Sequence, residues 1–402
     1  IATIKIGDLI EVRAGEKMPV DGKVTFATSF MKEDGAYVDE SMITGEPLPS
    51  EKQKGAMVMA GTMLSQGRLR FRARQVGEDT ALAQIVKMVR EAQGSKAPVQ
   101  RTVDRAALIF VPVVACVAVL TFVAWVVFGG FDCVPQGIIS AVAVLVVACP
   151  CAMGLATPTA LMVGIGKAAE KGILIKDATA LEQLRQIDTM VVDKTGTITI
   201  PNPNVDFTKT SSMPLEERET IKPNAAKAMT MLTDEGIEVH MMSGDTPEAA
   251  AYWAKKAGIA HYMSKALPQD KENLVRTLQE QGHKVAMVGD GINDTQALAL
   301  ADVSIAMGKG TDVAMDVAQI TLMTDDLKAL PEAVAMSRRT VKMIYQNLFW
   351  AFIYNIVCIP LAAGVLHLFG SDFQITPMWA SALMAFSSIS VVLNSLRLKY
   401  AI

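Results

Sequence analysis

The hydrophobic residues of this chain are gathered in four long runs, and the charged residues fill the stretches between them. The runs contain no Asp, Glu, Lys or Arg, and His367 is their only readily titratable polar side chain. Each run is long enough to cross the hydrocarbon core of a bilayer, which takes about 20 helical residues. Buried helices of large soluble proteins are usually shorter. The pattern therefore predicts four transmembrane helices, at Ala106–Phe128, Ile138–Gly166, Met343–Phe369 and Ile375–Leu396.

Basic residues lie at one end of each run, and this asymmetry predicts the orientation of the helices. The connectors 129–137 and 370–374 contain neither Lys nor Arg. Basic residues adjoin the opposite ends of the runs, at Arg101, Arg105, Lys167, Lys171, Lys176, Arg338, Arg339, Lys342, Arg397 and Lys399. We therefore expect two hairpins that cross the membrane, with every soluble segment on the cytoplasmic side.

The stretches outside the runs predict two soluble domains. Residues 1–95 are expected to be mostly β, because short alternating segments such as Leu9–Arg13 are separated by turn-forming pairs. Residues 168–336 alternate apolar strands with helical stretches, which is typical of an α/β domain built on a parallel sheet. The first transmembrane pair with its linker then occupies residues 96–167, and the second pair occupies residues 337–402.

Composition agrees with a membrane protein that carries folded soluble domains. The chain has 402 residues, 51% of them hydrophobic and 20% charged, and a net charge of −3. This length has room for two or three domains. The balance excludes a disordered chain and gives no sign of a nucleic-acid partner. Five cysteines are too few for a disulfide scaffold.

Polar clusters follow the predicted strands of the α/β domain where each strand ends. The cluster Asp193-Lys194-Thr195-Gly196-Thr197 comes directly after the apolar residues Met190–Val192. A carboxylate just beyond a buried strand can attack phosphorus and form an aspartyl phosphate. The anionic transition state needs positive charge and hydrogen-bond donors. We expect these from Lys194, Thr195 and Thr197 in this cluster. Lys271 in a separate loop adds further positive charge.

Two further strand ends carry polar clusters. Asp290-Gly291-Ile292-Asn293-Asp294 follows Val285–Val288, and its oxygens suit a hard ion such as Mg²⁺. Ser243 follows Val239–Met242 and offers a hydroxyl to phosphoryl oxygens. A lone Asp would be interpreted as a cap or turn residue. Because parallel strands present their carboxyl ends at one edge of a sheet, the set together predicts a phosphoryl-transfer site.

The second apolar run is interrupted by Cys149-Pro150-Cys151. Proline removes a backbone donor and clashes with the preceding turn, so we expect the helix to be unwound or kinked there. Broken helices near the middle of a bilayer are where transporters build substrate sites. Two thiolates aimed into one cavity favour a soft ion, Cu(I) first, with Ag(I) chemically close and Zn(II) behind. Cys116, Cys133 and Cys358 are interpreted as small packing residues.

The last two runs supply further polar groups. Tyr354-Asn355 places an amide in the third run, where it is costly unless it faces the helix bundle. Met384 and Ser388 lie one helical turn apart on one face of the fourth run. These four residues are our additional candidate ligands for the transported ion.

With these motifs, the chain resembles the P-type ATPases, whose phosphorylation domain belongs to the haloacid-dehalogenase-like superfamily. Asp193–Thr197 matches the family's phosphorylation motif, and Asp290–Asp294 matches its Mg²⁺-binding hinge motif, which contains Asn293. Thr44-Gly45-Glu46 matches the actuator-domain loop, so the resemblance implies that Glu46 positions water to hydrolyse the aspartyl phosphate. Ser243 stands where the family commonly has Thr, which keeps the hydroxyl.

Cysteine–proline–cysteine, Tyr354-Asn355 and Met384-x-x-Ser387-Ser388 together resemble the Cu(I) subgroup of heavy-metal P-type ATPases. The resemblance implies a multidomain membrane protein, with an α-helical transmembrane bundle, a β-rich actuator domain and an α/β phosphorylation domain. It implies ATP and Mg²⁺ as cofactors, Cu(I) or Ag(I) as cargo, a copper chaperone as partner, and residence in a lipid bilayer. The compact soluble portions favour a prokaryotic plasma membrane.

The chain departs from the family between its phosphorylation motif and the rest of that domain. The family inserts a nucleotide-binding domain there, whereas only Ile198–Thr220 occupies the interval, too short for a domain of about 50 residues or more. No histidine is followed by Pro, so the Ser-Glu-His-Pro nucleotide motif is absent. Earlier spans and amino-terminal metal-binding domains are also missing. We expect either joined segments of a larger pump, which we favour, or a truncated protein.

The hypothesis from sequence is an ATP-driven Cu(I) export pump that cycles through an aspartyl phosphate. Three alternatives remain open. One is a Zn(II) or Cd(II) pump of the same family. A membrane-anchored phosphatase without transport would leave Cys149 and Cys151 unexplained. A non-catalytic metal-binding fragment would apply if the nucleotide domain is truly missing.

Overall fold

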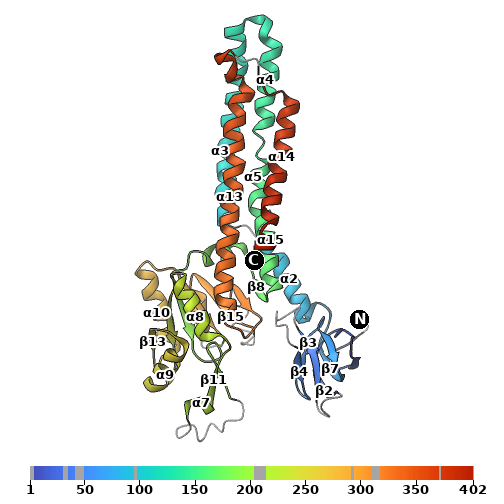
Figure 1. Ribbon diagram of the computed structural model, residues 1–402, viewed down its shortest axis with the longest axis vertical. Coiled ribbons are helices and arrows are strands. Elements are labelled where there is room, and N and C mark those ends of the chain that lie inside the picture. Colours follow the sequence, from blue (N-terminus) through green and yellow to red (C-terminus); the bar gives the residue numbers. More distant parts are fainter. Residues whose placement is uncertain are drawn as a thin grey trace. The chain divides into compact units, whose positions relative to one another are not determined.

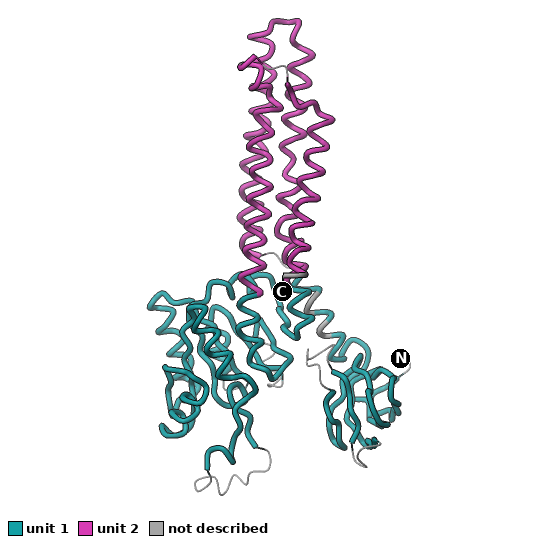
Figure 2. Tube along the Cα trace, viewed as in Figure 1, with its two compact units in different colours: residues 1–94, 165–335 teal, residues 95–164, 336–402 magenta. Residues whose placement is uncertain are grey.

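The structure is a computed structural model (Figure 1). It describes residues 4–29, 35–40, 49–94, 97–202, 214–290, 294–308, 317–370 and 373–401. The chain forms two compact units, which Figure 2 colours separately. The first unit contains residues 1–94 and 165–335, and the second contains residues 95–164 and 336–402.

Two antiparallel sheets form the amino-terminal domain of the first unit. The larger sheet has the order β1 (Leu9–Arg13), β7 (Arg68–Gln75), β2 (Asp21–Thr28), β5 (Met57–Val58). The smaller has the order β4 (Ser50–Lys52), β3 (Ala36–Asp39), β6 (Met63–Gln66). Alternate residues of β7 are buried, because successive side chains of a strand point to opposite faces. The predicted strand at Leu9–Arg13 is confirmed, and helix α2 (Ala81–Gly94) follows this domain.

A seven-stranded sheet forms the second domain of the first unit. Its order is β13 (His261–Met263), β12 (Glu238–Met242), β9 (Thr189–Asp193), β14 (Val285–Gly289), β15 (Val303–Met307), β16 (Ile320–Leu322), β8 (Ile173–Ile175). All neighbouring strands are parallel except β8, which runs antiparallel to β16. The predicted parallel sheet is therefore confirmed. Its third strand, β9, lies between β12 and β14 and ends at Asp193.

Helices and one hairpin complete this domain: α6 (Ala178–Leu184), α7 (Leu215–Arg218), α8 (Ala225–Asp234), α9 (Pro247–Ala257), α10 (Pro268–Glu280), α11 (Thr295–Leu300), and β10 (Thr199–Pro201) paired with β11 (Glu219–Ile221). The side chains of α10 and α11 pack on one face of the sheet in a shared apolar core. Helix α10 begins at Pro268, where proline suits the first helical position, and Asp270 accepts a hydrogen bond from the backbone N–H of Leu267. This start places Lys271 in the first turn of the helix.

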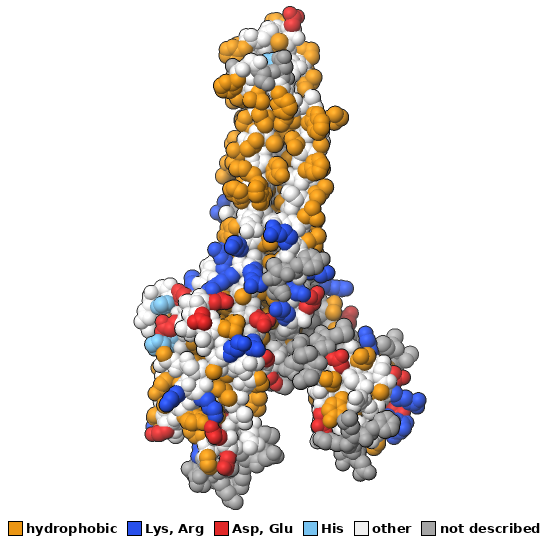
Figure 3. Space-filling model, viewed as in Figure 1, with side chains coloured by type: hydrophobic (Ala, Val, Ile, Leu, Met, Phe, Trp, Pro, Cys, Tyr) orange, Lys and Arg blue, Asp and Glu red, His pale blue; other side chains and the backbone are white. Residues whose placement is uncertain are grey.

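The second unit is helical, and apolar side chains cover it (Figure 3). Its helices are α3 (Pro98–Gly129), α4 (Val134–Val147), α5 (Cys151–Glu170), α13 (Ala329–Ala363), α14 (Pro377–Leu396) and α15 (Leu398–Ala401), with single turns η2 (Phe131–Cys133) and η5 (Val365–Phe369). Helices α5 and α13 run on into the first unit. Among the described residues, four helical stretches have the length and composition to cross a membrane.

Two details of the helical unit test the sequence predictions. The predicted interruption at Cys149-Pro150-Cys151 is confirmed, because α4 ends at Val147 and α5 begins at Cys151. The prediction of one continuous third span as far as Phe369 is wrong at its end. Helix α13 stops at Ala363 because Gly364 adopts the left-handed conformation, with φ +88°, and a 3₁₀ turn follows.

Candidate functional site

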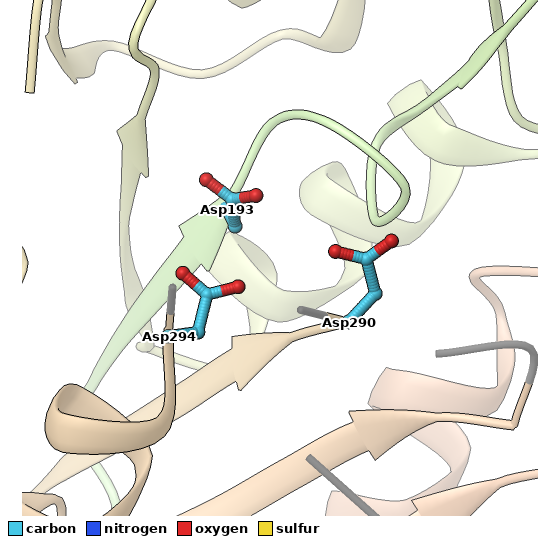
Figure 4. A group of neighbouring side chains, drawn as sticks. All are labelled: Asp193, Asp290 and Asp294. Carbon is cyan, nitrogen blue, oxygen red and sulfur yellow. The ribbon is translucent and has the colours of Figure 1, made fainter. Parts of the chain in front are cut away.

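Asp193, Asp290 and Asp294 bring their carboxylates together at the carboxyl end of the seven-stranded sheet (Figure 4). Asp193 is the last residue of β9, Asp290 directly follows β14, and Asp294 precedes α11. One carboxylate oxygen of each residue lies within 4.8 Å of those of the other two. The polar clusters that follow β9 and β14 in the sequence therefore meet at one point, as the parallel sheet requires.

Lys271 supplies positive charge to this group. Its ammonium lies 2.6 Å from Oδ1 of Asp193 and 2.6 Å from Oδ1 of Asp294. Burial lowers the pKa of Lys271, but the two carboxylates outweigh that effect and raise its pKa above the ordinary value. Lys271 is therefore cationic at neutral pH, and it bridges the two buried carboxylates.

Negative charge nevertheless exceeds positive charge at this site. Burial and the Asp294 carboxylate raise the pKa of Asp193 to about 7, although Lys271 opposes them. Burial and Asp294 also raise the pKa of Asp290. Hard oxygen donors that crowd together in this way suit a divalent cation such as Mg²⁺. The donor set therefore fits the magnesium ion that the sequence motif predicts.

Gly196 allows the loop after β9 to approach Asp290. Its φ is +74°, and a Cβ atom at this position would lie 1.4 Å from Oδ2 of Asp290. Lys222 also holds this loop, because its ammonium donates a hydrogen bond to the carbonyl oxygen of Gly196. Lys222 is buried, and it lowers the pKa of Asp290. The sequence pattern did not identify Lys222, because a lysine between Ile221 and Pro223 belongs to no motif that we recognised.

Lys194 differs from its expected role. Its side chain is fully buried, and its ammonium pairs with Glu219 on β11 and with Asp245. The positive charge that we expected Lys194 to present to a phosphoryl group is thus committed to two carboxylates. Lys194 joins the loop after β9 to the β10–β11 hairpin and to the loop after β12, and Lys271 carries the positive charge next to Asp193.

A cavity of about 290 Å³ opens over these carboxylates. It is lined by Asp193, Thr195, Gly244, Ala266, Pro268, Lys271, Asp290 and Asp294. Ser243 is buried beside it, and its hydroxyl accepts a hydrogen bond from the N–H of Asp245. A buried carboxylate with a neighbouring ammonium and a cavity above it is an arrangement that suits phosphoryl transfer.

Three other predicted residues have different outcomes. Thr197 is buried, and its hydroxyl has no hydrogen-bond partner among the described residues. Glu46 and Asn293 both lie outside the described residues. Their roles stay predictions.

In the helical unit, Cys149 and Cys151 flank the break between α4 and α5, and their sulfurs are joined in a disulfide. Both sulfurs are therefore adjacent, as a shared metal site requires. A disulfide has no thiolate, however, so reduction must precede binding of a soft ion through these sulfurs. Cys116, Cys133 and Cys358 are free.

The remaining candidate ligands lie on α13 and α14. Asn355 is 4% exposed, and its side-chain oxygen has no hydrogen-bond partner among the described residues. Tyr354, Met384 and Ser388 are half-buried. A buried, unpaired amide oxygen in an apolar helix is costly, which is consistent with a ligand role for Asn355.

Sequence reasoning missed a polar network elsewhere in the helical unit. The amide of Asn347 on α13 donates to the carbonyl oxygen of Ala156 on α5 and to the hydroxyl of Ser395 on α14, at 3.2 and 2.8 Å. Asn394 donates to Asn347, and Thr159 lies 3.0 Å from Ser395. The network links three helical segments. Its signal in the sequence was a set of isolated polar residues in apolar runs.

Two family models match parts of the chain. The model for the P-type ATPase actuator domain matches residues 1–90, and that for haloacid dehalogenase-like hydrolases matches residues 208–302.

Curated relatives extend the match over nearly the whole chain. Copper-transporting ATPase 1 of Rhizobium meliloti is 39% identical, covering 99% of this chain and 60% of the relative. The copper-exporting P-type ATPase of Bacillus subtilis is 38% identical, covering 99% and 61%. The chain thus spans about 60% of the length of these relatives. The first alignment runs over 501 positions, so that relative has residues with no counterpart among the 402 of this chain.

A solved structure is also similar. A zinc-transporting PIB-type ATPase in its E2.Pi state is 26% identical, with a TM-score of 0.63. The match covers 99% of this chain and 79% of that one.

Proposed function

Because this chain belongs to the P-type ATPase family, we propose that it forms the core of a pump that couples ATP hydrolysis to Cu(I) export across a membrane. The observation that carries the proposal is the position of Asp193, at the end of β9 and 2.6 Å from the ammonium of Lys271. The helical unit, the broken helix at Cys149–Cys151 and the copper-transporting names of the relatives support the cargo and the membrane location.

The proposed reaction begins at Asp193. Its carboxylate attacks the terminal phosphorus of ATP, a P–O bond to ADP breaks, and an aspartyl phosphate forms. Lys271 is placed to stabilise the negative charge that spreads over the phosphoryl oxygens. Thr195 lines the cavity, where its hydroxyl can donate to the same oxygens, and the hydroxyl of Ser243 is buried close by.

Asp193, Asp290 and Asp294 would hold Mg²⁺. The ion would neutralise charge on the phosphoryl group and on the three carboxylates. Lys194, Lys222 and Gly196 are proposed as positioning residues. Lys194 and Lys222 hold the loop after β9, and Gly196 leaves room for the Asp290 side chain. Glu46 is proposed to direct the water that hydrolyses the aspartyl phosphate.

The proposed cargo site contains the reduced sulfurs of Cys149 and Cys151. Among the other candidate ligands, Asn355 has the strongest support, because its side-chain oxygen is buried and has no hydrogen-bond partner among the described residues. Tyr354, Met384 and Ser388 complete the candidate set. Thiolate and thioether sulfur favour soft ions, and Ag(I) is chemically close to Cu(I), so we expect Ag(I) to bind at the same site. A copper chaperone would deliver the ion on the cytoplasmic side, and a prokaryotic plasma membrane is the proposed location.

A Zn(II) pump of the same family is the second candidate, because the similar solved structure is that of a zinc-transporting PIB-type ATPase. Thiolates also bind Zn(II), so the sulfurs alone do not decide between the ions. Stimulation by Zn(II) and not by Cu(I) would establish this alternative.

The test is ATP hydrolysis by the full-length protein in reduced form, titrated with Cu(I). We expect stimulation that is lost in Cys149→Ser and Cys151→Ser and kept in Cys116→Ser, since Cys116 is an exposed free cysteine of α3. Asp193→Asn should abolish the hydroxylamine-sensitive phosphoenzyme. Phosphoenzyme that persists in Asp193→Asn would refute the nucleophile, and turnover independent of every metal cargo would favour a phosphatase.

A further inference from the structure

The solvent-facing side of the four-stranded sheet in the actuator domain is strongly basic. Side chains alternate along β7, so Leu69, Phe71 and Ala73 enter the core while the residues between them point to solvent. The exposed residues are Arg68, Arg70, Arg72 and Arg74. Figure 3 shows Lys and Arg side chains gathered at one edge of this domain. One strand thus presents a row of guanidinium groups.

Neighbouring strands extend this basic face, because residues paired across antiparallel strands point to the same side of a sheet. Arg13 on β1 is the partner of Arg68, and Lys23 on β2 is the partner of Arg72. Both Arg13 and Lys23 are exposed. The face therefore carries six cationic side chains from three adjacent strands.

Glu11 on β1 is the only acid on this face among the described residues of the four strands. Its carboxylate accepts hydrogen bonds from Nε of Arg68 and of Arg70, at 2.7 and 2.6 Å. These guanidinium groups hold the pKa of Glu11 at about 2, so it is ionised at neutral pH. Asp21 on β2 is buried and accepts hydrogen bonds from backbone N–H groups. One carboxylate leaves most of the positive charge of the face uncompensated.

Exposed apolar side chains lie among these cations. They are Leu9 on β1, Phe26 on β2 and Met57 on β5, which are 58%, 46% and 45% exposed. Each is the register partner of a cationic residue on the neighbouring strand. The guanidinium of Arg70 lies 5.9 Å from the centroid of the Phe26 ring. Apolar side chains that are grouped in this way, within a polar rim, are typical of a contact surface.

The bilayer is the partner that the chain itself keeps close to this domain. Helix α2 ends at Gly94 and the apolar helix α3 begins at Pro98, so only residues 95–97 lie between them. A short tether of this kind holds a domain at a high effective concentration near lipid headgroups. Anionic headgroups attract basic side chains, and apolar side chains between them enter the interface.

We propose that this face, formed by β1, β2, β5 and β7, binds the anionic surface of the membrane. Its arginines contact lipid phosphates, because the planar guanidinium fork matches the geometry of phosphate oxygens. Leu9, Phe26 and Met57 rest at the boundary of the acyl chains. None of the residues that line the cavity over Asp193 belongs to the face. The proposal does not depend on pump activity, because lipid contact is measured without turnover.

The test uses the full-length protein in nanodiscs, with a bimane label at Leu9→Cys. Cys116, Cys133 and Cys358 are replaced by Ser, and the Cys149–Cys151 disulfide is kept, so that the label reacts at one position. Quenching by lipid that carries a nitroxide on its acyl chain reports contact with the bilayer. Membranes of phosphatidylcholine alone are compared with an equimolar mixture of phosphatidylcholine and phosphatidylglycerol.

We expect quenching to be at least about twofold stronger in the membrane that contains phosphatidylglycerol. The difference should disappear as salt rises from about 0.1 M to about 1 M, because the Debye length falls from about 10 Å to about 3 Å. Equal quenching in the two membranes at low salt would overturn the proposal. If polyglutamate nevertheless bound to the face, an acidic protein segment would replace the membrane as its partner.

Arg72→Glu combined with Arg74→Glu is the decisive variant, because both side chains are exposed and lie outside the core. We expect its quenching in the anionic membrane to fall to the level in phosphatidylcholine. Arg72→Lys with Arg74→Lys keeps the charge and should keep most of the quenching. Lys23→Glu, on a different strand, should act in the same direction as the double reversal, which separates a loss of contact from a misfolded β7.

Lys227→Glu combined with Lys255→Glu is the matched control. It changes the net charge by the same amount, at exposed residues of the phosphorylation domain. We expect its quenching to equal that of the wild type. Unchanged quenching in the double reversal of Arg72 and Arg74, or an equal loss in this control, would each overturn the proposal.

Discussion

The ammonium of Lys271, in the first turn of α10, lies 2.6 Å from Oδ1 of Asp193 at the end of β9. The two residues come from separate segments of the chain and meet because α10 packs on the sheet beside β14. The same ammonium also lies 2.6 Å from Oδ1 of Asp294, so one cation serves both the proposed nucleophile and a predicted magnesium ligand. The charge balance of the site therefore depends on Lys271.

Replacing Lys271 with Met should strongly reduce phosphoenzyme formation. The substitution removes the only ammonium bonded to Asp193 among the described residues, and loss of one preorganised donor costs about 10²–10³ in rate. The measurement is the initial rate of Asp193 phosphorylation, from ATP and from inorganic phosphate, at saturating Mg²⁺. Lys255→Met is the control, because Lys255 is exposed on α9. Equal rates in wild type and Lys271→Met would contradict this role.

Replacing Gly196 with Ala should weaken the activation of phosphorylation by Mg²⁺. The added Cβ would lie 1.4 Å from Oδ2 of Asp290, so the loop or that carboxylate must move. We expect the Mg²⁺ concentration for half-maximal phosphoenzyme to rise at least about tenfold, as for a displaced ligand. The readout is a Mg²⁺ titration.

Gly236→Ala is the control for Gly196→Ala. Gly236 has a φ of +80°, close to the +74° of Gly196, but its Cβ would meet nothing within 4 Å. Both variants bear similar backbone strain, of the order of 1 kcal/mol. Only Gly196→Ala disturbs Asp290. If both variants needed the same raised Mg²⁺ concentration for half-maximal phosphoenzyme, backbone strain, and not the clash with Asp290, would explain the effect of Gly196→Ala.

Stability of the metal-free protein should fall as pH rises, because of Asp193. The pKa of this carboxyl is raised from 3.8 to about 7 by burial and by Asp294. The folded state therefore binds more protons than the unfolded state between these values, and the free energy of unfolding decreases as pH rises through that window. Above about pH 7 the destabilisation is complete.

Asp193→Asn removes the titrating group and so tests this sign. In EDTA we expect its melting temperature to exceed that of wild type at pH 8, and the difference to shrink at pH 5. Added Mg²⁺ should reduce the difference at pH 8, since the ion neutralises the carboxylates of the wild type. A wild type that is the more stable protein at pH 8 in EDTA would contradict the raised pKa of Asp193.

The sequence predicted the position of this site because strand ends are a local property. Apolar residues ending at Asp193 and at Asp290 marked two strands, and a parallel sheet brings such ends to one edge. The break at Pro150 was equally local, since proline cannot donate the hydrogen bond that the helix needs.

Side-chain direction was not predictable in the same way. Lys194 adjoins Asp193 in sequence but points to Glu219 and Asp245, because consecutive residues at a strand end face opposite sides. Lys222 directly follows β11 and bonds to Gly196 in the loop after β9, a contact between distant segments that no local pattern encodes. The end of α13 was a missed local signal, because Gly364 is the residue type that stops helices in a left-handed conformation.

Replacing Asn347 with Leu should destabilise the helical unit. Asn347 is fully buried, and its loss leaves Asn394 and Ser395 without partners from α13. Such interhelical hydrogen bonds in membranes contribute about 1–2 kcal/mol at most. We expect a lower melting temperature of the detergent-solubilised protein, measured by loss of intrinsic fluorescence. Ser381→Ala is the control, because the Ser381 hydroxyl donates to Pro377 of its own helix. An equal effect of both substitutions would contradict the network's role in joining the helices.

Oxidation of Cys149 and Cys151 should stop cargo-dependent turnover while the phosphorylation site stays intact. The disulfide in the structure joins the two sulfurs that we assign to Cu(I), and a disulfide offers no thiolate to a soft cation. We expect Cu(I)-stimulated ATP hydrolysis to disappear after mild oxidation and to return with a thiol reductant. We expect phosphorylation of Asp193 from inorganic phosphate to be equal in both redox states, because neither cysteine lines the cavity over Asp193.

Cys358→Ser serves as the control for oxidation, because Cys358 is the free cysteine that is buried in the same unit. Its redox response should match that of the wild type, whereas Cys149→Ser should lose Cu(I) stimulation in either state. Full Cu(I) stimulation while mass spectrometry finds the Cys149–Cys151 disulfide intact would exclude these sulfurs as ligands. The cargo site would then have to be built from the other candidate ligands, Tyr354, Asn355, Met384 and Ser388. Their oxygen and amide groups outnumber the single thioether of Met384 and would favour a harder ion.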